Sequence, residues 1–289
     1  INLPNANWIR KEYGSKSVTI DNITHAYNEA AKGNGFNEEF MIDAETIAMY
    51  ENAGACGDLH TDLHECVGHG SGKLMPGVSK DALKEHASTI EETRADLLGL
   101  YYMADEKLVE LGLLPDTNAY KGFFYQQMMN GLMTQLVRIE PGKDIEESHM
   151  RNRQLIAQWV YKHATNGEVE IVEKDGKHYL QINDYPGVRR LYGELLREVQ
   201  RITSEGDYPA AKAMVEEFAV KVDQDLHKEI LERYEKLNLA PYKGFVNPVY
   251  TAHYDAEGNI VDVTIDYTEG YIEQHLRYSR DYSHLPDIN

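Results

Sequence analysis

The sequence predicts a mainly α-helical α+β protein that carries one or two small β-hairpins. Apolar residues recur at intervals of three and four over most of the 289 residues, which is typical of amphipathic helices. Only two stretches alternate in the way of strands, and each contains a glycine where a turn is expected. Hydrophobic residues make up 42% of the chain, enough for a full core, and we expect a single compact lobe over residues 1–289.

The expected helices follow a short extended start. The helix over 84–111 ends before Gly112 and Pro115, and Asp116 and Thr117 cap the helix that follows. The ranges expected to be helical are about 22–32, 57–74, 84–111, 120–136, 145–164, 187–204, 208–222 and 225–237, with a polar, Tyr-rich helix at the end of the chain.

Two hairpins complete the expected elements. Residues 168–183 alternate around Asp175-Gly176, a pair that readily adopts the positive φ angles of a two-residue turn. Residues 246–267 form the second candidate, with its turn at 257–259.

Composition excludes several classes of partner. The net charge of −19, from 48 acidic and 29 basic residues, argues against binding to nucleic acid or to an anionic membrane. The chain contains no run of 18 apolar residues, so we expect no transmembrane helix. The two cysteines, Cys56 and Cys66, cannot build a disulfide framework, which favours a reducing, cytoplasmic location.

The segment His64-Glu65-Cys66-Val67-Gly68-His69 has the residue types of a zinc hydrolase site. Two imidazoles can bind the ion, and the carboxylate of Glu65 can act as a base beside it. In a regular helix, however, residues five apart point about 140° away from each other. We therefore expect a wide turn of the π-bulge type, with Gly68 at the point where the backbone departs from the α-helix.

A third ligand is expected from the start of the helix over 84–111. Glu92 and Asp96 share one face of that helix, so one carboxylate could bind the metal while the other accepts a hydrogen bond from a ligand imidazole. The alternative is an acidic first turn that the helix dipole favours.

These segments resemble the paired signature of the dipeptidyl peptidase III family, zinc metallopeptidases that release dipeptides from the N-termini of short peptides. The similarity includes His64–His69, Glu91–Asp96 and the continuation of the first segment to Leu74. Asn2-Leu3-Pro4-Asn5 is similar to a substrate-binding segment of the family, and His149-Met150-x-x-Arg153 to a helix whose His steadies the reacting carbonyl.

The resemblance implies a role for each matching residue and a metallopeptidase catalytic lobe as the fold. One Zn²⁺ ion would be held by His64, His69 and Glu92, with Glu65 as general base and His149 as a partner of the transition state. The remaining roles implied are hydrogen bonding to the ligand imidazoles by Glu91 and Asp96, and substrate binding by Asn2, Asn5 and Arg153.

The resemblance begins within the family pattern, and the first residue is Ile1 rather than Met. We therefore expect the chain to be part of a longer, two-lobed protein whose N-terminal lobe completes the cleft for short peptide substrates. On its own, the chain is expected to bind zinc with weak or no activity.

Other functions stay open from the sequence. The lobe could be a zinc-stabilised peptide-binding or scaffold module without activity, although Glu65 beside the metal argues for catalysis. It could also be a zinc amidase that acts on a non-peptide substrate, and the metal could be another divalent ion that binds imidazole and carboxylate. Without the resemblance, His149 and Arg153 are two polar neighbours on a helix surface.

Overall fold

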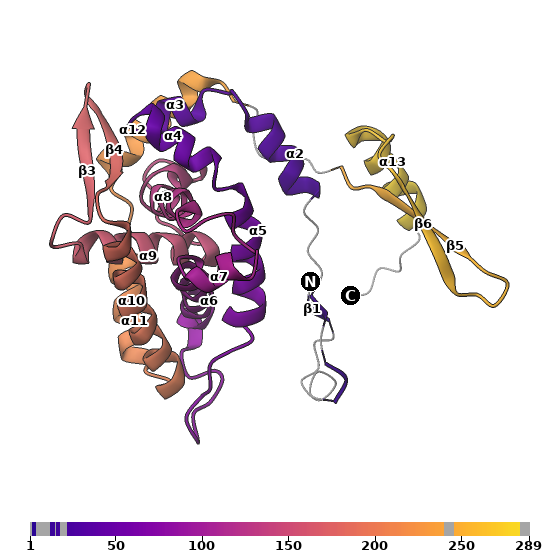
Figure 1. Ribbon diagram of the computed structural model, residues 1–289, viewed down its shortest axis with the longest axis horizontal. Coiled ribbons are helices and arrows are strands. Elements are labelled where there is room, and N and C mark those ends of the chain that lie inside the picture. Colours follow the sequence, from indigo (N-terminus) through magenta and orange to yellow (C-terminus); the bar gives the residue numbers. More distant parts are fainter. Residues whose placement is uncertain (1, 4–11, 15, 18–21, 240–245, 284–289) are drawn as a thin grey trace. The chain divides into compact units, whose positions relative to one another are not determined.

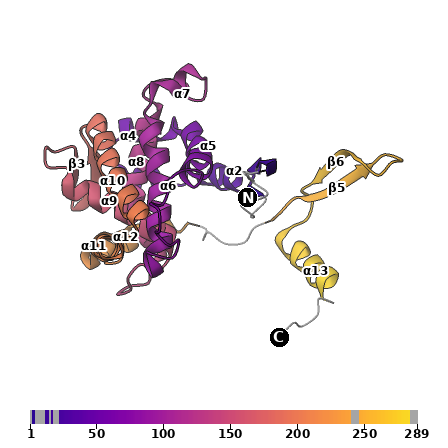
Figure 2. The same cartoon turned by 90° about the horizontal axis from the view of Figure 1, so that it is seen from below.

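The computed structural model describes residues 2–3, 12–14, 16–17, 22–239 and 246–283. These residues are mostly helical, with three antiparallel pairs of short strands, which confirms the expected fold class (Figures 1 and 2). The chain forms two compact units, one from residues 1–17 and 35–238 and the other from residues 18–34 and 239–289.

The first unit contains most of the helices. Its α-helices are α3 (Phe36–Phe40), α4 (Ala44–Glu51), α5 (Gly54–Leu63), α6 (Ala87–Met103), α7 (Glu106–Glu110), α8 (Ala119–Leu132), α9 (Ser148–His163), α10 (Tyr185–Glu205), α11 (Tyr208–Phe218) and α12 (Gln224–Leu237). It also contains the π-helical turn η1 (His64–Gly68), the 3₁₀ turns η2 (Lys84–His86) and η3 (Thr134–Arg138), and the short strand pair β1 (Asn2–Leu3) and β2 (Lys16–Ser17).

Helix α6 lies at the centre of the packing that positions the functional residues. It contacts α5, η1, α9 and α10, and α8 packs in turn against α4, α5 and α9. Leu97 and Leu100 of α6 are buried with Leu195 and Val199 of α10 and Leu155 of α9. Removing these side chains from water stabilises the unit and fixes α6 among its neighbours.

The chain carries local signals for where several helices begin. Asp116 accepts hydrogen bonds from the backbone N–H groups of Asn118 and Ala119, as the expected cap at this point requires. Asp43 does the same for Thr46 at the start of α4, although α3 and α4 were not expected from the sequence.

The first hairpin is confirmed. Strands β3 (Val169–Lys174) and β4 (Lys177–Ile182) pair in register up to Lys174 and Lys177. Asp175 and Gly176 form the turn with φ angles of 53° and 71°. Two successive positive φ angles match the right-handed twist of the flanking strands, so this dipeptide fixes the register.

Two expected helix ranges are wrong in detail. The helix expected over 57–74 ends with η1 at Gly68, and residues 71–75 have no regular structure. The helix expected over 84–111 is divided, because α6 ends at Met103 and Asp105 caps the separate helix α7 by accepting from the Lys107 N–H.

The second unit consists of α2 (Asn22–Ala31), the hairpin β5 (Val249–Tyr254) and β6 (Ile260–Asp266), and α13 (Tyr271–Tyr282). The second hairpin and the Tyr-rich final helix are thereby confirmed. Gln274 of α13 ties the helix to the segment before β5, since its side chain both accepts from the Asn247 N–H at 2.7 Å and donates to the Asn247 carbonyl at 2.6 Å. Within the described ranges, no helix is both long and apolar enough to span a membrane.

Candidate metal centre

The wide turn expected between the two motif histidines is confirmed. The backbone N–H of His69 donates to the carbonyl of His64 at 2.9 Å, which is an i to i−5 bond, and residues His64–Gly68 are π-helical. The added residue lets both rings lie on the same side. Their centroids are 4.7 Å apart and their planes are nearly perpendicular, at 89°.

Gly68 is required for a reason that the sequence did not reveal. It is buried, and a Cβ atom at this position would lie 2.7 Å from the Cα of Ala95 in α6. Its φ angle is not among the positive ones, so left-handed backbone freedom is not what the position uses. The missing side chain instead allows η1 to approach the backbone of α6 closely, at the level of the candidate ligands.

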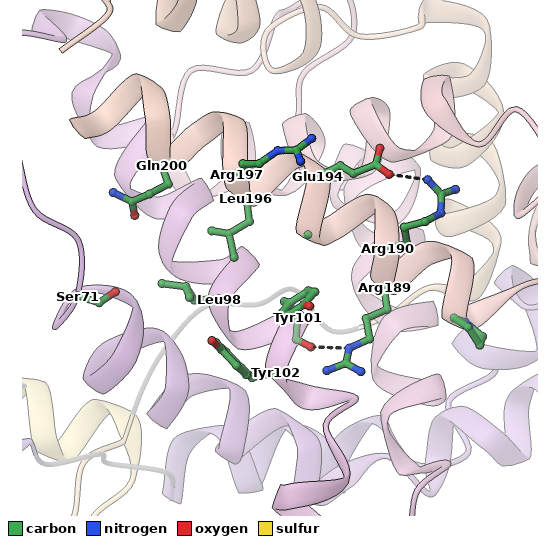
Figure 3. Close-up of a pocket in the computed structure, with 12 residues that line it drawn as sticks. Ser71, Leu98, Tyr101, Tyr102, Arg189, Arg190, Glu194, Leu196, Arg197 and Gln200 are labelled. Carbon is green, nitrogen blue, oxygen red and sulfur yellow. Dashed lines mark hydrogen bonds and ion pairs between the residues drawn. The ribbon is translucent and has the colours of Figure 1, made fainter. Parts of the chain in front are cut away.

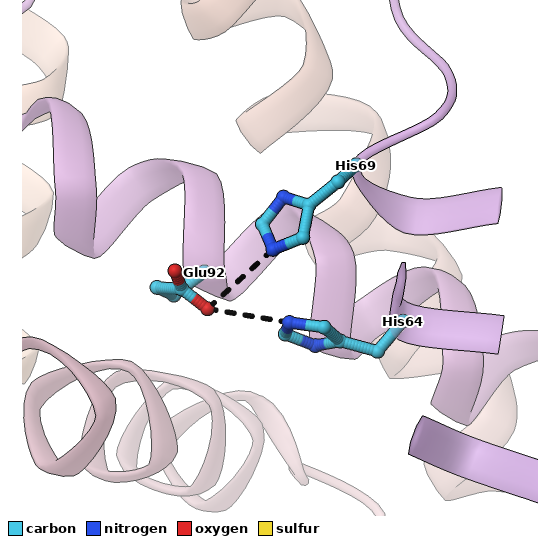
Figure 4. Close-up of side chains that lie close together, drawn as sticks. All are labelled: His64, His69 and Glu92. Carbon is cyan, nitrogen blue, oxygen red and sulfur yellow. Dashed lines mark ion pairs between the residues drawn. The ribbon is translucent and has the colours of Figure 1, made fainter. Parts of the chain in front are cut away.

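Helix α6 brings Glu92 to the two imidazoles (Figure 4). The Oε2 atom of Glu92 lies 3.3 Å from Nε2 of His64 and 3.8 Å from Nε2 of His69. Ligands of a tetrahedral zinc ion at about 2.0–2.1 Å are themselves about 3.4 Å apart. The three side chains therefore have the spacing of a metal-binding set.

The carboxylate of Glu92 also shows an unsatisfied polar atom. Oε2 is buried and has no hydrogen-bond partner among the described residues. Leaving a buried carboxylate oxygen without a hydrogen bond is costly, and a cation between this atom and the two imidazoles would compensate for it. The donor set of two imidazoles and one carboxylate therefore fits a zinc ion.

The two candidate ligand imidazoles are oriented by two further carboxylates. Nδ1 of His64 lies 2.6 Å from Oδ1 of Asp96, and Nδ1 of His69 lies 2.9 Å from Oε1 of Glu91. In each ring the Nδ1–H group can thus donate to a carboxylate, and Nε2 is the atom that faces Glu92.

The same contacts control the charge of His64. Burial opposes protonation of this ring, but the hydrogen-bonded Asp96 and the nearby Glu92 outweigh burial and raise the pKa of His64 to about 10. In the absence of a cation the ring is therefore charged at neutral pH. A metal ion would replace the proton on Nε2 and leave the Nδ1–H bond to Asp96 in place.

His149 lies in the first turn of α9, directly beside this group. Its Nε2 atom lies 3.5 Å from Oε2 of Glu92, and its Nδ1 atom lies 2.8 Å from Oε1 of Glu147. Glu147 is the N-cap of α9 and also accepts from the backbone N–H of His149. Sequence reasoning missed Glu147, because Glu is not among the residues that favour the N-cap position.

Arg153 lies one turn further along α9 and is partly buried. Burial raises the pKa of Asp96, but the hydrogen bond from His64 and the nearby charges of His64 and Arg153 outweigh burial and lower it. Arg153 is thus electrostatically coupled to the centre. The side chain of His60 also points to this region, with Nε2 at 3.3 Å from the carbonyl of Asp96, and no motif in the sequence indicates its presence here.

For the other residues considered in the sequence, the structure gives a position on an element or no position at all. Glu65 lies in η1 between the two histidines and is partly exposed. Asn2 belongs to β1, and Asn5 lies outside the described residues. Cys66 is exposed and is not part of the group that could hold a metal.

A separate groove of about 700 Å³ runs between α6 and α10 (Figure 3). Tyr101, Tyr102 and Leu98 line it from α6, and Arg197 and other residues line it from α10. None of the candidate metal ligands lines this groove, so it is distinct from the metal centre.

Comparison with known proteins gives one consistent family. The model described as peptidase family M49 matches residues 1–85 and 76–260. Dipeptidyl peptidase 3 of Mus musculus is 26% identical over 265 residues, which cover 77% of this chain and 35% of the mouse protein. The Homo sapiens protein of the same name is 25% identical over 266 residues, with the same coverage. The chain thus spans about a third of the length of these curated relatives.

Two solved structures share the fold. The structure of DPP III from Caldithrix abyssi has a TM-score of 0.60 and 24% identity, and the match covers 82% of this chain and 42% of that one. The dipeptidyl-peptidase III from Corallococcus sp. strain EGB has a TM-score of 0.60 and 21% identity, with 81% and 41% covered.

Proposed function

The chain belongs to peptidase family M49, and we propose that it carries the catalytic centre of a zinc-dependent peptidase that releases dipeptides from the N-termini of short peptides. The observation that carries the proposal is the convergence of His64 and His69 on the buried Oε2 atom of Glu92, which accepts no hydrogen bond from the described residues. A bound zinc ion supplies a Lewis acid, which polarises a peptide carbonyl and lowers the pKa of water.

Within this proposal, Glu65 is the general base and later the acid. It takes a proton from the attacking water and returns it to the leaving amine, a contribution that is typically worth about 10²–10⁴ in rate. Its place in η1, between the two histidines, supports this role, because the turn that presents the imidazoles also carries the carboxylate.

His149 and Arg153 are proposed to face the substrate from α9. His149 would donate a hydrogen bond to the oxyanion, and its Nε2 atom at 3.5 Å from Glu92 supports a place beside the reacting carbonyl. Arg153 would bind a carbonyl or carboxylate of the peptide, and Asn2 and Asn5 would hold the peptide backbone or its free amine. Glu91 and Asp96 would keep the Nε2 atoms of the ligand imidazoles directed to the metal.

We also propose that the chain acts as one catalytic lobe of a longer protein. Support comes from the length of the relatives, of which 35% is matched in the mouse protein. In this proposal the remaining part contributes the opposite wall of the peptide cleft, so full activity needs both parts.

The test compares the wild-type chain with the Glu65→Gln variant in two assays. Zinc content per chain is measured by elemental analysis, and dipeptide release from short peptides by mass spectrometry. We expect one zinc ion per chain in both proteins and, when the chain is part of the longer protein, a loss of activity of at least about 100-fold in the variant. Glu232→Gln, which changes an exposed carboxylate on α12, is the matched control and should retain the activity.

Near-normal dipeptide release by Glu65→Gln, with its zinc content verified, would overturn the assignment of the base. A wild-type chain that binds no zinc would overturn the metal centre. Zinc binding without any release by the wild-type chain would favour a lobe that binds peptides but needs the rest of a longer protein for turnover.

A further inference from the structure

Arg94 is a buried charge whose hydrogen bonds all go to the surroundings of one candidate ligand. Its side chain is only 2% exposed. Nε donates to Oε2 of Glu91 at 2.9 Å and Nη2 to Oε1 of the same carboxylate at 2.6 Å. Nη2 also donates to the carbonyl of Gly68 at 2.7 Å, and Nη1 donates to Oγ of Ser71 at 3.2 Å. A planar guanidinium can hold several acceptors in fixed positions at once because its donors form a rigid fork. The ammonium group of a lysine lacks this geometry.

Each of these acceptors controls a different part of His69. Glu91 accepts from Nδ1 of the His69 ring at 2.9 Å and so sets the ring orientation. Gly68 directly precedes His69 and is the last residue of the π-helical turn. Ser71 follows two residues later and itself donates to the Gly68 carbonyl at 3.2 Å. The guanidinium therefore links the ring, the turn before the residue and the loop after it.

The loop after His69 is shaped to leave room for this link. A Cβ atom on Gly72, whose φ angle is +84°, would lie 3.1 Å from Nη1 of Arg94. A Cβ atom on Gly70 would lie 2.1 Å from the carbonyl oxygen of Cys66, so the backbone turns back sharply at this point. Ser71 then reaches the edge of the groove between α6 and α10 (Figure 3).

The two candidate imidazoles are held in different ways. His64 directly follows the regular helix α5, and its Nδ1 atom is hydrogen-bonded to Asp96. Arg94 takes part in neither of these constraints. His69 has no helix after it, and 29% of its side chain is exposed. The loss of Arg94 should therefore loosen His69 selectively.

We propose that Arg94 is a positioning residue that directs Nε2 of His69 to the metal by holding the Glu91 carboxylate and the Gly68 carbonyl in one fixed arrangement. This inference rests on the proposed metal centre. It concerns the geometry of one ligand, so it can fail while the metal centre stands.

The test uses Arg94→Lys in the full 289-residue chain, because lysine keeps the charge and loses the planar fork. Zinc affinity is measured by competition with a chromophoric chelator, and the ligand geometry by the visible absorption spectrum after replacement of zinc with Co²⁺. We expect the zinc affinity to fall about 10- to 100-fold, as for other residues that orient metal ligands, and the Co²⁺ spectrum to change.

Arg233→Lys is the matched control. Arg233 is also 2% exposed, and it bonds to Glu39 at 2.8 Å, to Glu229 at 2.9 Å and to the His178 carbonyl at 2.7 Å, away from the metal ligands. Its replacement should lower the melting temperature while the zinc affinity and the Co²⁺ spectrum stay as in the wild type. The control therefore distinguishes a general loss of folding stability from the lower zinc affinity and changed Co²⁺ spectrum expected for Arg94→Lys.

A milder variant covers the case in which Arg94→Lys does not fold. Ser71→Ala removes one acceptor of the guanidinium and should lower the zinc affinity about fivefold, the equivalent of one hydrogen bond. Ser79→Ala, which removes the hydroxyl that accepts from the Asp81 N–H, should leave the affinity unchanged.

Wild-type zinc affinity and an unchanged Co²⁺ spectrum in folded Arg94→Lys would overturn the positioning role. If Arg94→Lys does not fold, an unchanged affinity in Ser71→Ala would overturn it. If the wild-type chain itself bound no zinc, the proposed function would fail and the inference with it.

Discussion

The Nδ1 atom of His64 lies 2.6 Å from the Oδ1 atom of Asp96, and this hydrogen bond joins the π-helical turn η1 to helix α6. It leaves Nε2 of the same ring facing Glu92, at 3.3 Å from Oε2. The orientation of the His64 ring is thus fixed by Asp96, which lies one helical turn after the candidate ligand Glu92 on α6. A substitution at Asp96 should therefore weaken metal binding although all three candidate ligands are unchanged.

Replacement of Asp96 by Asn should weaken metal binding. Asn keeps the size of the side chain but loses the negative charge that stabilises the Nδ1–H group of His64. We expect the zinc affinity to fall about 10- to 100-fold, measured by competition with a chelator. Glu168→Gln is the control, since it neutralises a carboxylate that is 3% exposed and pairs with Arg190 instead. Equal zinc affinity in both variants would contradict the role of Asp96.

Replacement of Gly68 by Ala should destabilise the protein through a steric clash. The new Cβ atom would lie 2.7 Å from the Cα of Ala95, so η1 and α6 would have to separate. Overpacking of this kind costs about 1–3 kcal/mol in the free energy of unfolding, which urea denaturation measures.

Gly57→Ala provides the comparison within the preceding helix. Among the described residues, no atom outside the local helix backbone lies within 4 Å of a Cβ at Gly57, so alanine should stabilise α5 by about 0.5–1 kcal/mol. If the two variants had the same stability, the close approach at Gly68 would not be the reason for a glycine there.

The ion pairs of Glu39 should make stability depend on pH in the acidic range. Oε2 lies 2.8 Å from Nζ of Lys177 and Oε1 lies 2.8 Å from Nε of Arg233. Burial raises the pKa of Glu39, but these two cations outweigh burial and lower it below its ordinary value.

Because the pKa is lower in the folded state, these ion pairs stabilise the protein above the pKa of the unfolded chain. The stabilisation is lost as the pH falls through the pKa of the folded state. Glu39→Gln should therefore lower the melting temperature near pH 7, and the difference from the wild type should shrink below about pH 4. Glu235→Gln, at an exposed position of α12, is the control. A difference that stays constant from pH 7 to pH 3 would contradict this assignment.

Much of the centre could be predicted because its chemistry is local in the sequence. The five-residue spacing of His64 and His69 cannot fit a regular helix, so it required the wide turn that the structure contains. Glu92 and Asp96 are one helical turn apart on α6, and this spacing alone places both carboxylates on the face that meets η1.

The features that could not be predicted depend on contacts between segments that are distant in the sequence. The periodicity of apolar residues carries no information about such contacts. The need for glycine at position 68 comes from the approach of Ala95, and the partners of Arg94 include the Gly68 carbonyl, 26 residues away. The helix also ends after Gly68, where the backbone turns sharply at Gly70. The sequence contains no proline at this point, which would have been a stronger signal for the end of a helix. Helices α3 and α4 are short, and short helices carry little periodic signal.

The most direct test of the central claim is a crystal structure of the zinc-loaded chain, with anomalous diffraction recorded above and below the zinc absorption edge. We expect one anomalous peak, with Nε2 of His64, Nε2 of His69 and a carboxylate oxygen of Glu92 at about 2.0–2.2 Å from the ion. A peak at any other place in the chain, or a ligand set that excludes Glu92, would contradict it.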